Sequence, residues 1–214
     1  MEASFWHQKW ERGEIGFHES ETNPMLAEHF KELNLTKGSR IFLPLCGKTR
    51  DAAWLLARGY RVAGAELSEL AINGLFKELG LEPEISKVGK LVRYHAEDID
   101  IFAGDIFAVS AECLGPINAI YDRAALVALP ACVRRHYTSH LMNITGAAPQ
   151  LLITYEYDPL LMDGPPFSVN EDEVKQHYAA AYRLQFVGSK DVAGGLKGKV
   201  MSTETAWLLQ KKIG

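Results

Sequence analysis

Strand-like and helix-like segments alternate along most of the chain. Short apolar runs bounded by Gly and Pro indicate strands, and the segments between them repeat their apolar positions with the period of a helix. Seven strands are predicted in this way, at residues 40–44, 61–67, 91–98, 117–122, 150–157, 182–188 and 201–211. Alternation of this kind is typical of an α/β fold, in which a mostly parallel sheet carries helices on both faces.

Start and stop signals place the helices between these strands. The helix after the first strand is closed by Gly59, and the next begins after Ser68, a good N-cap, and ends before Gly80. A third helix of about a dozen residues is expected after Pro130. Two amphipathic pieces precede the sheet, at residues 4–12 and 24–35. The Thr-rich alternation of the last two strands predicts a closing antiparallel pair.

Composition limits the class of protein. The chain has 214 residues, 47% of them hydrophobic, and 23 basic against 27 acidic residues give a net charge of −4. A nucleic-acid-binding domain would be basic, so no nucleic-acid partner is expected. No apolar run approaches the roughly 20 residues that a membrane helix needs. Without a repeat, a linker or a low-complexity tract, residues 1–214 are expected to form one domain.

Cysteine usage and the N-terminus predict a cytoplasmic protein. The three cysteines, Cys46, Cys113 and Cys132, form no CxxC pair, which argues against a disulfide framework and a zinc ribbon. The first residues, MEASFWHQKWER, lack the basic start and apolar centre of a signal peptide. A soluble protein in a reducing compartment is therefore expected.

The stretch FLPLCGKTRD, at residues 42–51, ends a buried strand with a Gly-Lys turn. In open α/β sheets ligands bind beyond the carboxyl ends of the strands, and Gly47 would let the main chain approach such a ligand. Glu66 ends the second strand, where a carboxylate can accept hydrogen bonds from both hydroxyls of a ribose. The alternative is a plain turn with a solvated Lys48 and a surface Glu66.

Two phosphate-binding motifs are missing from this region. There is no GxGxxG, and PLCGKT lacks the first glycine of a GxxxxGK[ST] loop because Phe42 stands in its place. A ribose site without a pyrophosphate cradle favours S-adenosylmethionine over NAD or ATP. A nicotinamide oxidoreductase on a similar sheet stays the alternative enzyme.

Other candidate constellations are weaker. His136 and His140 have the i, i+4 spacing of a zinc pair, but no third ligand is evident, so a solvated helix face is the better interpretation and no metal is expected. Cys46 has no catalytic signature around it, which favours a buried structural thiol.

Four motifs together are similar to one family. They are SFWHQKWERGEIGFHE, FLPLCGKTRDAAWLLARGYRVAGAELSE, YDRAALVALP and GPPF, and in this order and spacing they resemble the bacterial branch of the thiopurine S-methyltransferases over essentially the whole chain. The resemblance implies a class I methyltransferase (Rossmann-like) fold with a seven-stranded, mostly parallel sheet.

The resemblance also implies an activity. It is the transfer of a methyl group from S-adenosylmethionine, which leaves as S-adenosylhomocysteine, to the sulfur of thiopurines and other aromatic or heterocyclic thiols. For the bacterial branch, selenium and tellurium compounds stay open as acceptors, and with them roles in detoxification and metalloid resistance. A monomer with a small-molecule thiol substrate is expected. A non-catalytic sensor that binds S-adenosylmethionine is the alternative from another class of function.

Carried over residue by residue, the resemblance assigns the site. The cofactor pocket would include Trp10, Leu45, Glu66, Ile106 and Arg123. The family's aromatic lid falls on Trp6, Trp10 and Phe17, within a helical cover formed by residues 1–35. Two tryptophans at helical spacing would on their own more often belong to a core.

Arg123 is the expected catalytic residue. It directly follows the fourth strand, and its permanent charge could stabilise the thiolate form of an acceptor without acting as a base. The alternative is a salt bridge from Arg123 to Asp122 or Glu156. In the late segment VAGGLKGKV this chain departs from its mammalian relatives, so substrate contacts cannot be carried over there.

Overall fold

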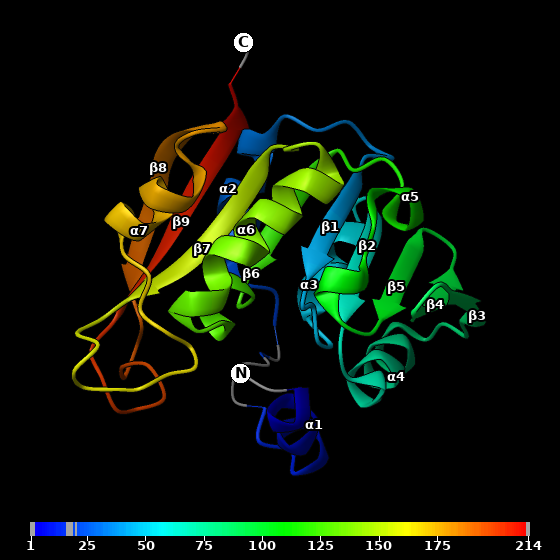
Figure 1. Cartoon of the computed structure of the whole chain (residues 1–214), viewed down its shortest axis with the longest axis horizontal. Coiled ribbons are helices and arrows are strands. Elements are labelled where there is room, and N and C mark those ends of the chain that lie inside the picture. Colours follow the sequence, from blue (N-terminus) through cyan, green and yellow to red (C-terminus); the bar gives the residue numbers. More distant parts are fainter. Residues whose placement is uncertain (1–2, 16–18, 20, 213–214) are drawn as a thin grey trace. The chain divides into compact units, whose positions relative to one another are not determined.

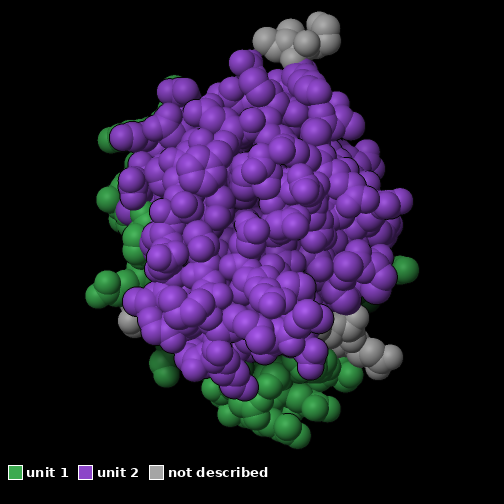
Figure 2. Space-filling model, turned by 90° about the vertical axis from the view of Figure 1, so that its left-hand side faces the viewer, with its two compact units in different colours: residues 1–24, 35–118 green, residues 25–34, 119–214 purple. Residues whose placement is uncertain are grey.

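The computed structural model describes residues 3–15, 19 and 21–212 (Figure 1). Its strands form a nine-stranded sheet in the order β3-β4-β5-β2-β1-β6-β7-β9-β8. The chain divides into two compact units (Figure 2): unit 1 comprises residues 1–24 and 35–118, and unit 2 comprises residues 25–34 and 119–214. The α/β class is confirmed, with two strands more than the predicted seven.

Unit 1 is built on three parallel strands. Its strands are β1 (Arg40–Pro44), β2 (Arg61–Glu66), β3 (Glu84–Val88), β4 (Leu91–Ala96) and β5 (Ile99–Ala103). Its helices are α1 (Ala3–Glu11), α3 (Arg50–Leu56), α4 (Glu69–Leu79), η2 (Ile106–Ala108) and α5 (Ala111–Leu114). β2 pairs in parallel with β1 and with β5, and all three strands are almost wholly buried, as expected of parallel strands covered on both faces.

Unit 2 combines a parallel pair of strands with an antiparallel edge. Its strands are β6 (Ala119–Arg123), β7 (Gln150–Glu156), β8 (Tyr182–Asp191) and β9 (Thr203–Lys211). Its helices are α2 (Pro24–His29), η1 (Phe30–Leu33), η3 (Leu126–Ala128), α6 (Ala131–Thr145) and α7 (Glu171–Tyr178). β6 and β7 are parallel, whereas β9 runs antiparallel to both β7 and β8. The predicted closing antiparallel pair is confirmed.

The sequence prediction was wrong around residues 84–103. The expected strand at 91–98 ends at Ala96, and β5 follows it after a tight turn that places Asp98 at φ +60°. The parallel neighbour of β2 is therefore β5, and β4 runs antiparallel to it. The turn contains neither Gly nor Pro, so no breaker marks it in the sequence. β3 was missed because its side chains are mostly exposed and polar, and only its pairing with β4 makes it a strand.

The predicted helix signals hold. Ser68 caps α4 by accepting a hydrogen bond from the Ala71 amide, and Gly80 ends the helix in the left-handed conformation. α7 was missed; Asn170 caps it, and three acidic residues fill its first turn. Among the residues that the structure describes, no helix is both long enough and apolar enough to cross a membrane.

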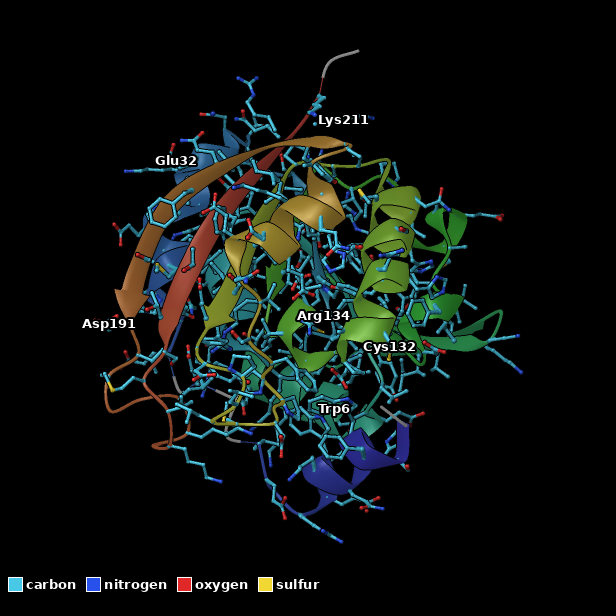
Figure 3. The ribbon with its side chains drawn as sticks, turned by 60° about the vertical axis from the view of Figure 1, so that its left-hand side comes forward. Trp6, Glu32, Cys132, Arg134, Asp191 and Lys211 are labelled. Carbon is cyan, nitrogen blue, oxygen red and sulfur yellow. The ribbon has the colours of Figure 1, made fainter. Side chains whose placement is uncertain are left out.

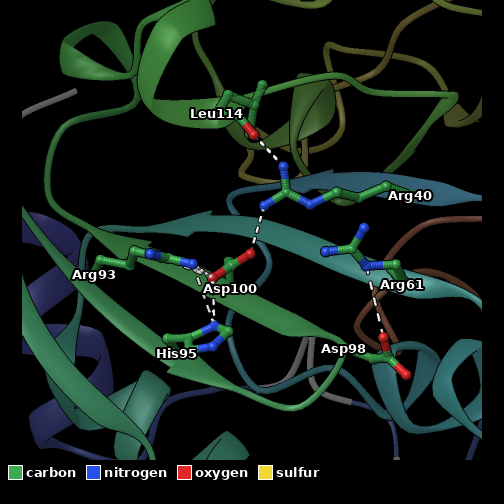
Figure 4. A network of polar contacts seen from close by, with 7 residues as sticks. All are labelled: Arg40, Arg61, Arg93, His95, Asp98, Asp100 and Leu114. Carbon is green, nitrogen blue, oxygen red and sulfur yellow. Dashed lines mark hydrogen bonds and ion pairs between the residues drawn. The ribbon is translucent and has the colours of Figure 1, made fainter.

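A polar network joins the amino-terminal ends of β1 and β5 to β4 (Figure 4). Asp100 of β5 accepts hydrogen bonds from Arg40 at 2.6 Å and from Arg93 at 2.8 Å, and lies 2.9 Å from Nδ1 of His95. Burial disfavours the charged carboxylate, but the bonds from Arg93 and His95 and the charge of Arg40 hold the pKa of Asp100 below its ordinary value. Arg40 also donates to the Leu114 carbonyl, which ties α5 to β1. These hydrogen bonds have a structural role, and a ligand site is expected instead at the carboxyl ends of β1, β2 and β5.

Gly64, in the middle of β2, should be intolerant of a methyl group. An added Cβ would lie 2.6 Å from Cδ1 of Ile101 and 2.9 Å from Sγ of Cys46, both of which are buried. Gly64→Ala should lower the free energy of unfolding by about 1–3 kcal/mol through overpacking, as measured by urea denaturation. Ile101→Val removes the nearer atom and should recover part of the loss. An equal loss in the double variant would show that Ile101 is not the obstacle.

Candidate functional site

The candidate site of unit 1 lies at the carboxyl ends of β1, β2 and β5. The Cys46 amide donates to the Ala65 carbonyl at 3.0 Å, and the Gly104 amide donates to the Glu66 carbonyl at 2.9 Å, so these strand ends stay in register as they leave the sheet. α1 lies beyond the arrowhead of β1 (Figure 1), and Trp6 lies on this helix (Figure 3). In a parallel sheet this edge is where ligands bind.

The turn after β1 has an unusual backbone. Leu45 lies at φ +47° and Gly47 at φ +54°, both in the left-handed region. A left-handed conformation is costly for a residue with a side chain, so Leu45 is held there by its surroundings. Thr49 then caps α3 by accepting from the Asp51 amide at 3.2 Å. The turn therefore has a specific conformation that its surroundings stabilise.

Glu66 holds this turn in place. Its buried carboxylate accepts a hydrogen bond from the Gly47 amide at 2.8 Å and another from the Ser68 amide at 2.8 Å. Burial raises the pKa of Glu66 above its ordinary value, while the bonds from Ser68 and Gly47 work in the opposite direction. A carboxylate has about four lone-pair positions, so acceptor capacity remains for further donors. Glu66 is thus not the surface residue of the alternative prediction.

Trp10 covers the turn from the other side. Its side chain is buried, and a Cβ added to Gly47 would lie 3.1 Å from Cζ2 of the indole. His7, one helical turn earlier, is near enough that its charge would lower the pKa of Glu66. α1 therefore closes over the strand ends in unit 1. Trp6 lies four residues before Trp10 and is half-buried, with its ring edge to face against Phe5 at 5.2 Å between centroids.

The remaining predicted cofactor residue of unit 1 follows β5. Ile106 is buried in η2, which Asp105 caps by accepting from the Phe107 amide at 3.0 Å. Trp10, Leu45, Glu66 and Ile106 are thus all placed at or over the same strand ends. Phe17, the other predicted lid residue, lies outside the described residues.

Two neighbouring side chains have structural roles. Lys48 donates to Glu78 of α4 at 2.8 Å, so it is not a solvated lysine. Cys46 is buried, and burial together with the charge of Glu66 raises the pKa of its thiol well above the ordinary value. A thiol that resists ionisation is a poor nucleophile, which agrees with a structural Cys46.

Arg123, the expected catalytic residue, ends β6 in unit 2 and is half-buried. Asp122, its neighbour, is fully buried and accepts from the Leu126 amide at 3.0 Å and from the Tyr137 hydroxyl at 2.7 Å. Neither of these two hydrogen bonds to Asp122 comes from Arg123. Burial raises the pKa of Asp122 to about 6.

The histidine pair of α6 lies on an outward face of the helix without a third ligand among the described residues. The rings of His136 and His140 have centroids 6.4 Å apart, and His136 is exposed. Within the described part of the chain, no three His, Cys, Asp or Glu side chains gather in a way that could hold a metal ion.

Sequence reasoning missed two buried polar residues. Asp51 accepts from the Asn23 amide at 2.8 Å and thereby joins the segment before α2 to the start of α3. Arg134 of α6 (Figure 3) is buried, donates to the Ser168 carbonyl at 3.3 Å and pairs with Glu173 of α7 at 3.1 Å. The spacing of Arg134 with the core positions Tyr137 and Leu141 was the available signal, because it puts the charge on the buried face of α6.

Comparison with known proteins assigns the family. The family model described as Thiopurine S-methyltransferase (TPMT) matches residues 1–212. The chain belongs to the thiopurine S-methyltransferase family. A thiopurine S-methyltransferase of Xanthobacter autotrophicus is 50% identical over 212 residues, which cover 99% of this chain and 100% of that protein. One of Teredinibacter turnerae is 51% identical over 213 residues, which cover 100% of this chain and 99% of that protein.

Solved structures agree on the fold. The chain resembles the 1,6-didemethyltoxoflavin-N1-methyltransferase of Burkholderia thailandensis, a structure with 1,6-didemethyltoxoflavin and S-adenosylhomocysteine bound. The TM-score is 0.66 at 16% identity, over 98% of this chain and 87% of the other. Family and fold together make this chain an S-adenosylmethionine-dependent class I methyltransferase.

Asp122 should impose a pH dependence on stability. In the unfolded chain its carboxyl group ionises near 3.8, but in the folded protein only near 6. Between these values the folded state holds a proton that the unfolded state has released, so stability falls as pH rises, by about 2–3 kcal/mol in total. The difference in unfolding free energy between the wild type and Asp122→Asn, measured by urea denaturation at pH 4 to 7.5, should show this decline. A pH-independent difference would mean that Asp122 titrates normally.

Proposed function

We propose that this chain transfers the methyl group of S-adenosylmethionine to the sulfur of thiopurines and of other aromatic or heterocyclic thiols. The full-length relatives at about half identity, which are named thiopurine S-methyltransferases, support this acceptor class. Selenium and tellurium compounds are included as further acceptors, because they too are soft nucleophiles.

The observation that carries the proposal is the buried Glu66 carboxylate bonded to the amide of Gly47. It places a charged acceptor with remaining lone pairs beside a turn where a Cβ would press on Trp10. Such a group suits the two hydroxyls of a ribose, and the missing Cβ of Gly47 lets the indole of Trp10 close over the turn. The residues present therefore fit S-adenosylmethionine, with Leu45 and Ile106 as apolar walls of the same pocket.

The helix α1 supplies the cover of the proposed pocket. Trp6 and Trp10 stand on one face of it, and an aromatic face attracts a sulfonium as it attracts an ammonium, by roughly 0.5–2 kcal/mol. Together with Phe17 they form the aromatic lid of the proposed site. Of the predicted helical cover of residues 1–35, residues 25–34 belong to unit 2, so the proposed cover is limited to residues 1–24. This cover would exclude water from the reacting atoms.

Bound S-adenosylmethionine supplies an activated methyl group, so the chain has to align the acceptor and favour its thiolate form. Alignment alone can contribute about 7–11 kcal/mol to a bimolecular step. We assign Arg123 to the acceptor end of the cofactor. Its guanidinium cannot act as a base, but its charge lowers the cost of ionising a nearby thiol.

The cellular setting belongs to the same proposal. We place the protein in the cytoplasm as a monomer that detoxifies small thiols and metalloid compounds without a nucleic-acid or membrane partner. The near balance of charge and the free thiols of Cys46, Cys113 and Cys132 support this setting, because disulfides are rare in reducing compartments.

The proposal is tested by calorimetry with S-adenosylmethionine and NADH, followed by a methyl-transfer assay over sulfur, selenium and oxygen acceptors. Binding of S-adenosylmethionine and methylation of thiols are expected. Binding of NADH alone would indicate an oxidoreductase. Binding of S-adenosylmethionine without transfer to any acceptor would indicate a sensor.

Replacement of Glu66 should weaken cofactor binding. Glu66→Ala removes a charged acceptor of two hydroxyls and the support of the Gly47 amide, so binding of S-adenosylmethionine should fall by about 2–4 kcal/mol in calorimetry. Glu66→Gln keeps one carbonyl acceptor and should lose less. Glu78→Ala is the matched control, since that carboxylate pairs with Lys48 outside the pocket. Unchanged affinity in a folded Glu66→Ala protein would place the ribose elsewhere.

Replacement of Arg123 should affect acceptors according to their acidity. Arg123→Ala should lower turnover by roughly a hundredfold for a thiol that is protonated at neutral pH, and much less for one already ionised. The rate–pH curve of the weak acid should move to higher pH, because its thiolate has lost a stabilising charge. Arg123→Lys should recover only part of the rate. An equal loss for both thiols, with a lowered melting temperature, would make Arg123 a structural residue.

A further inference from the structure

The turn that follows β6 is held by a buried acid–phenol pair. Asp122 accepts from the Leu126 amide across a turn in which Ala124 lies at φ +62°. A non-glycine residue in the left-handed region needs its surroundings to impose that conformation. The hydrogen bonds from Leu126 to Asp122 and from Tyr137 to Asp122 provide the restraint, and all four residues belong to unit 2.

The pair is costly for the core that contains it. Asp122 and Tyr137 are both fully buried, and burial raises the pKa of Asp122 to about 6. A core built only for stability would be at least as stable with apolar groups of the same shape. Retention of a buried carboxylate at the end of β6 therefore points to a role in placing the residues around it.

Arg123 lies between the two restrained residues. The carboxylate of Asp122 accepts from the amide of Leu126, three residues after Arg123, and the left-handed Ala124 follows Arg123 directly. The backbone of Arg123 is thus held on one side by its pairing with Ile153 of β7 and on the other by the turn that the pair restrains.

The same turn also supports the GPPF segment. The Val127 carbonyl accepts from the Phe167 amide at 2.6 Å, and Arg134 of α6 donates to the Ser168 carbonyl. The 3-10 helix η3, which begins at the end of the turn, is therefore bonded to the GPPF segment through Val127.

From this geometry we propose that Asp122 and Tyr137 are positioning residues of the methyl transfer, which orient Arg123 toward the acceptor through the turn 124–126. This inference rests on the proposed function and on the role assigned to Arg123 there. Neither residue of the pair needs to touch the acceptor or the cofactor.

Tyr137→Phe is the sharpest variant, because it removes one donor and keeps the ring. Tyr182→Phe is its matched control: Tyr182 is another buried tyrosine of unit 2, and its hydroxyl donates to the Ala148 carbonyl at 2.9 Å, remote in sequence from the turn. Tyr137→Phe should lose more stability than Tyr182→Phe, because its partner is a carboxylate and not a neutral carbonyl, so kcat is measured at a temperature where both variants are fully folded. Only Tyr137→Phe should lower kcat, by about ten- to a hundredfold, since small misplacements of an aligning group have effects of this size.

A double-mutant cycle shows whether the pair acts through Arg123. In an Arg123→Ala background, Tyr137→Phe should change kcat by less than about twofold, because the residue that it orients is gone. An equal loss of kcat in both backgrounds, or an equal loss in Tyr137→Phe and Tyr182→Phe, would overturn the inference.

A readout without turnover keeps this test separate from the proposed function. The Nε–H resonance of Arg123 in a ¹⁵N–¹H spectrum is assigned by its absence in Arg123→Ala. It should shift or broaden in Tyr137→Phe and stay in place in Tyr182→Phe. An unmoved resonance in both variants would overturn the inference, even if the wild type methylates thiols. A wild type that methylates none would overturn the proposed function instead, whatever the resonance does.

Discussion

The hydrogen bond from the Gly47 amide to the Glu66 carboxylate is the constraint on which the candidate site depends. It joins the turn after β1 to the last residue of β2, and it keeps Gly47 left-handed beneath the indole of Trp10. Without it, the turn would have a buried amide with no acceptor, a loss of about 1–3 kcal/mol. The carboxylate accepts from backbone amides of its own unit, and acceptor capacity remains for a further donor.

In unit 2 another buried carboxylate also accepts a hydrogen bond from the amide of a turn. Asp122 near the end of β6 bonds back to an amide of the turn that follows, and the left-handed residue there is Ala124. In both units a buried carboxylate stabilises a backbone conformation that few side chains tolerate. Strain of this kind clusters at functional sites because a rigid turn places side chains more exactly than a relaxed one.

Patterns local in the sequence were predictable, whereas features that depend on distant partners were not. Ser68 and Gly80 marked the ends of α4 because capping is decided within a few residues. The importance of Glu66 could be inferred from its offset after Gly47, but the bond between them required the parallel register of β1 and β2. β3 could not be predicted, since its residues have little strand character until β4 pairs with it.

In the loops of unit 2, the motif GPPF could be recognised from the sequence, but the hydrogen bonds that hold it could not. GPPF is conspicuous as a sequence, yet two of the bonds that hold it and the next residue go to main-chain carbonyls: that of Pro165 accepts from Lys197, and that of Ser168 accepts from Arg134. Every residue has a backbone carbonyl, so the sequence does not indicate which carbonyl accepts a hydrogen bond. Only the donor side chain can be recognised from its residue type. Lys197 therefore gains a defined role in the segment VAGGLKGKV, where substrate contacts could not be transferred from relatives. It holds the loop after β8 against the loop after β7, whose courses lie close together in Figure 1.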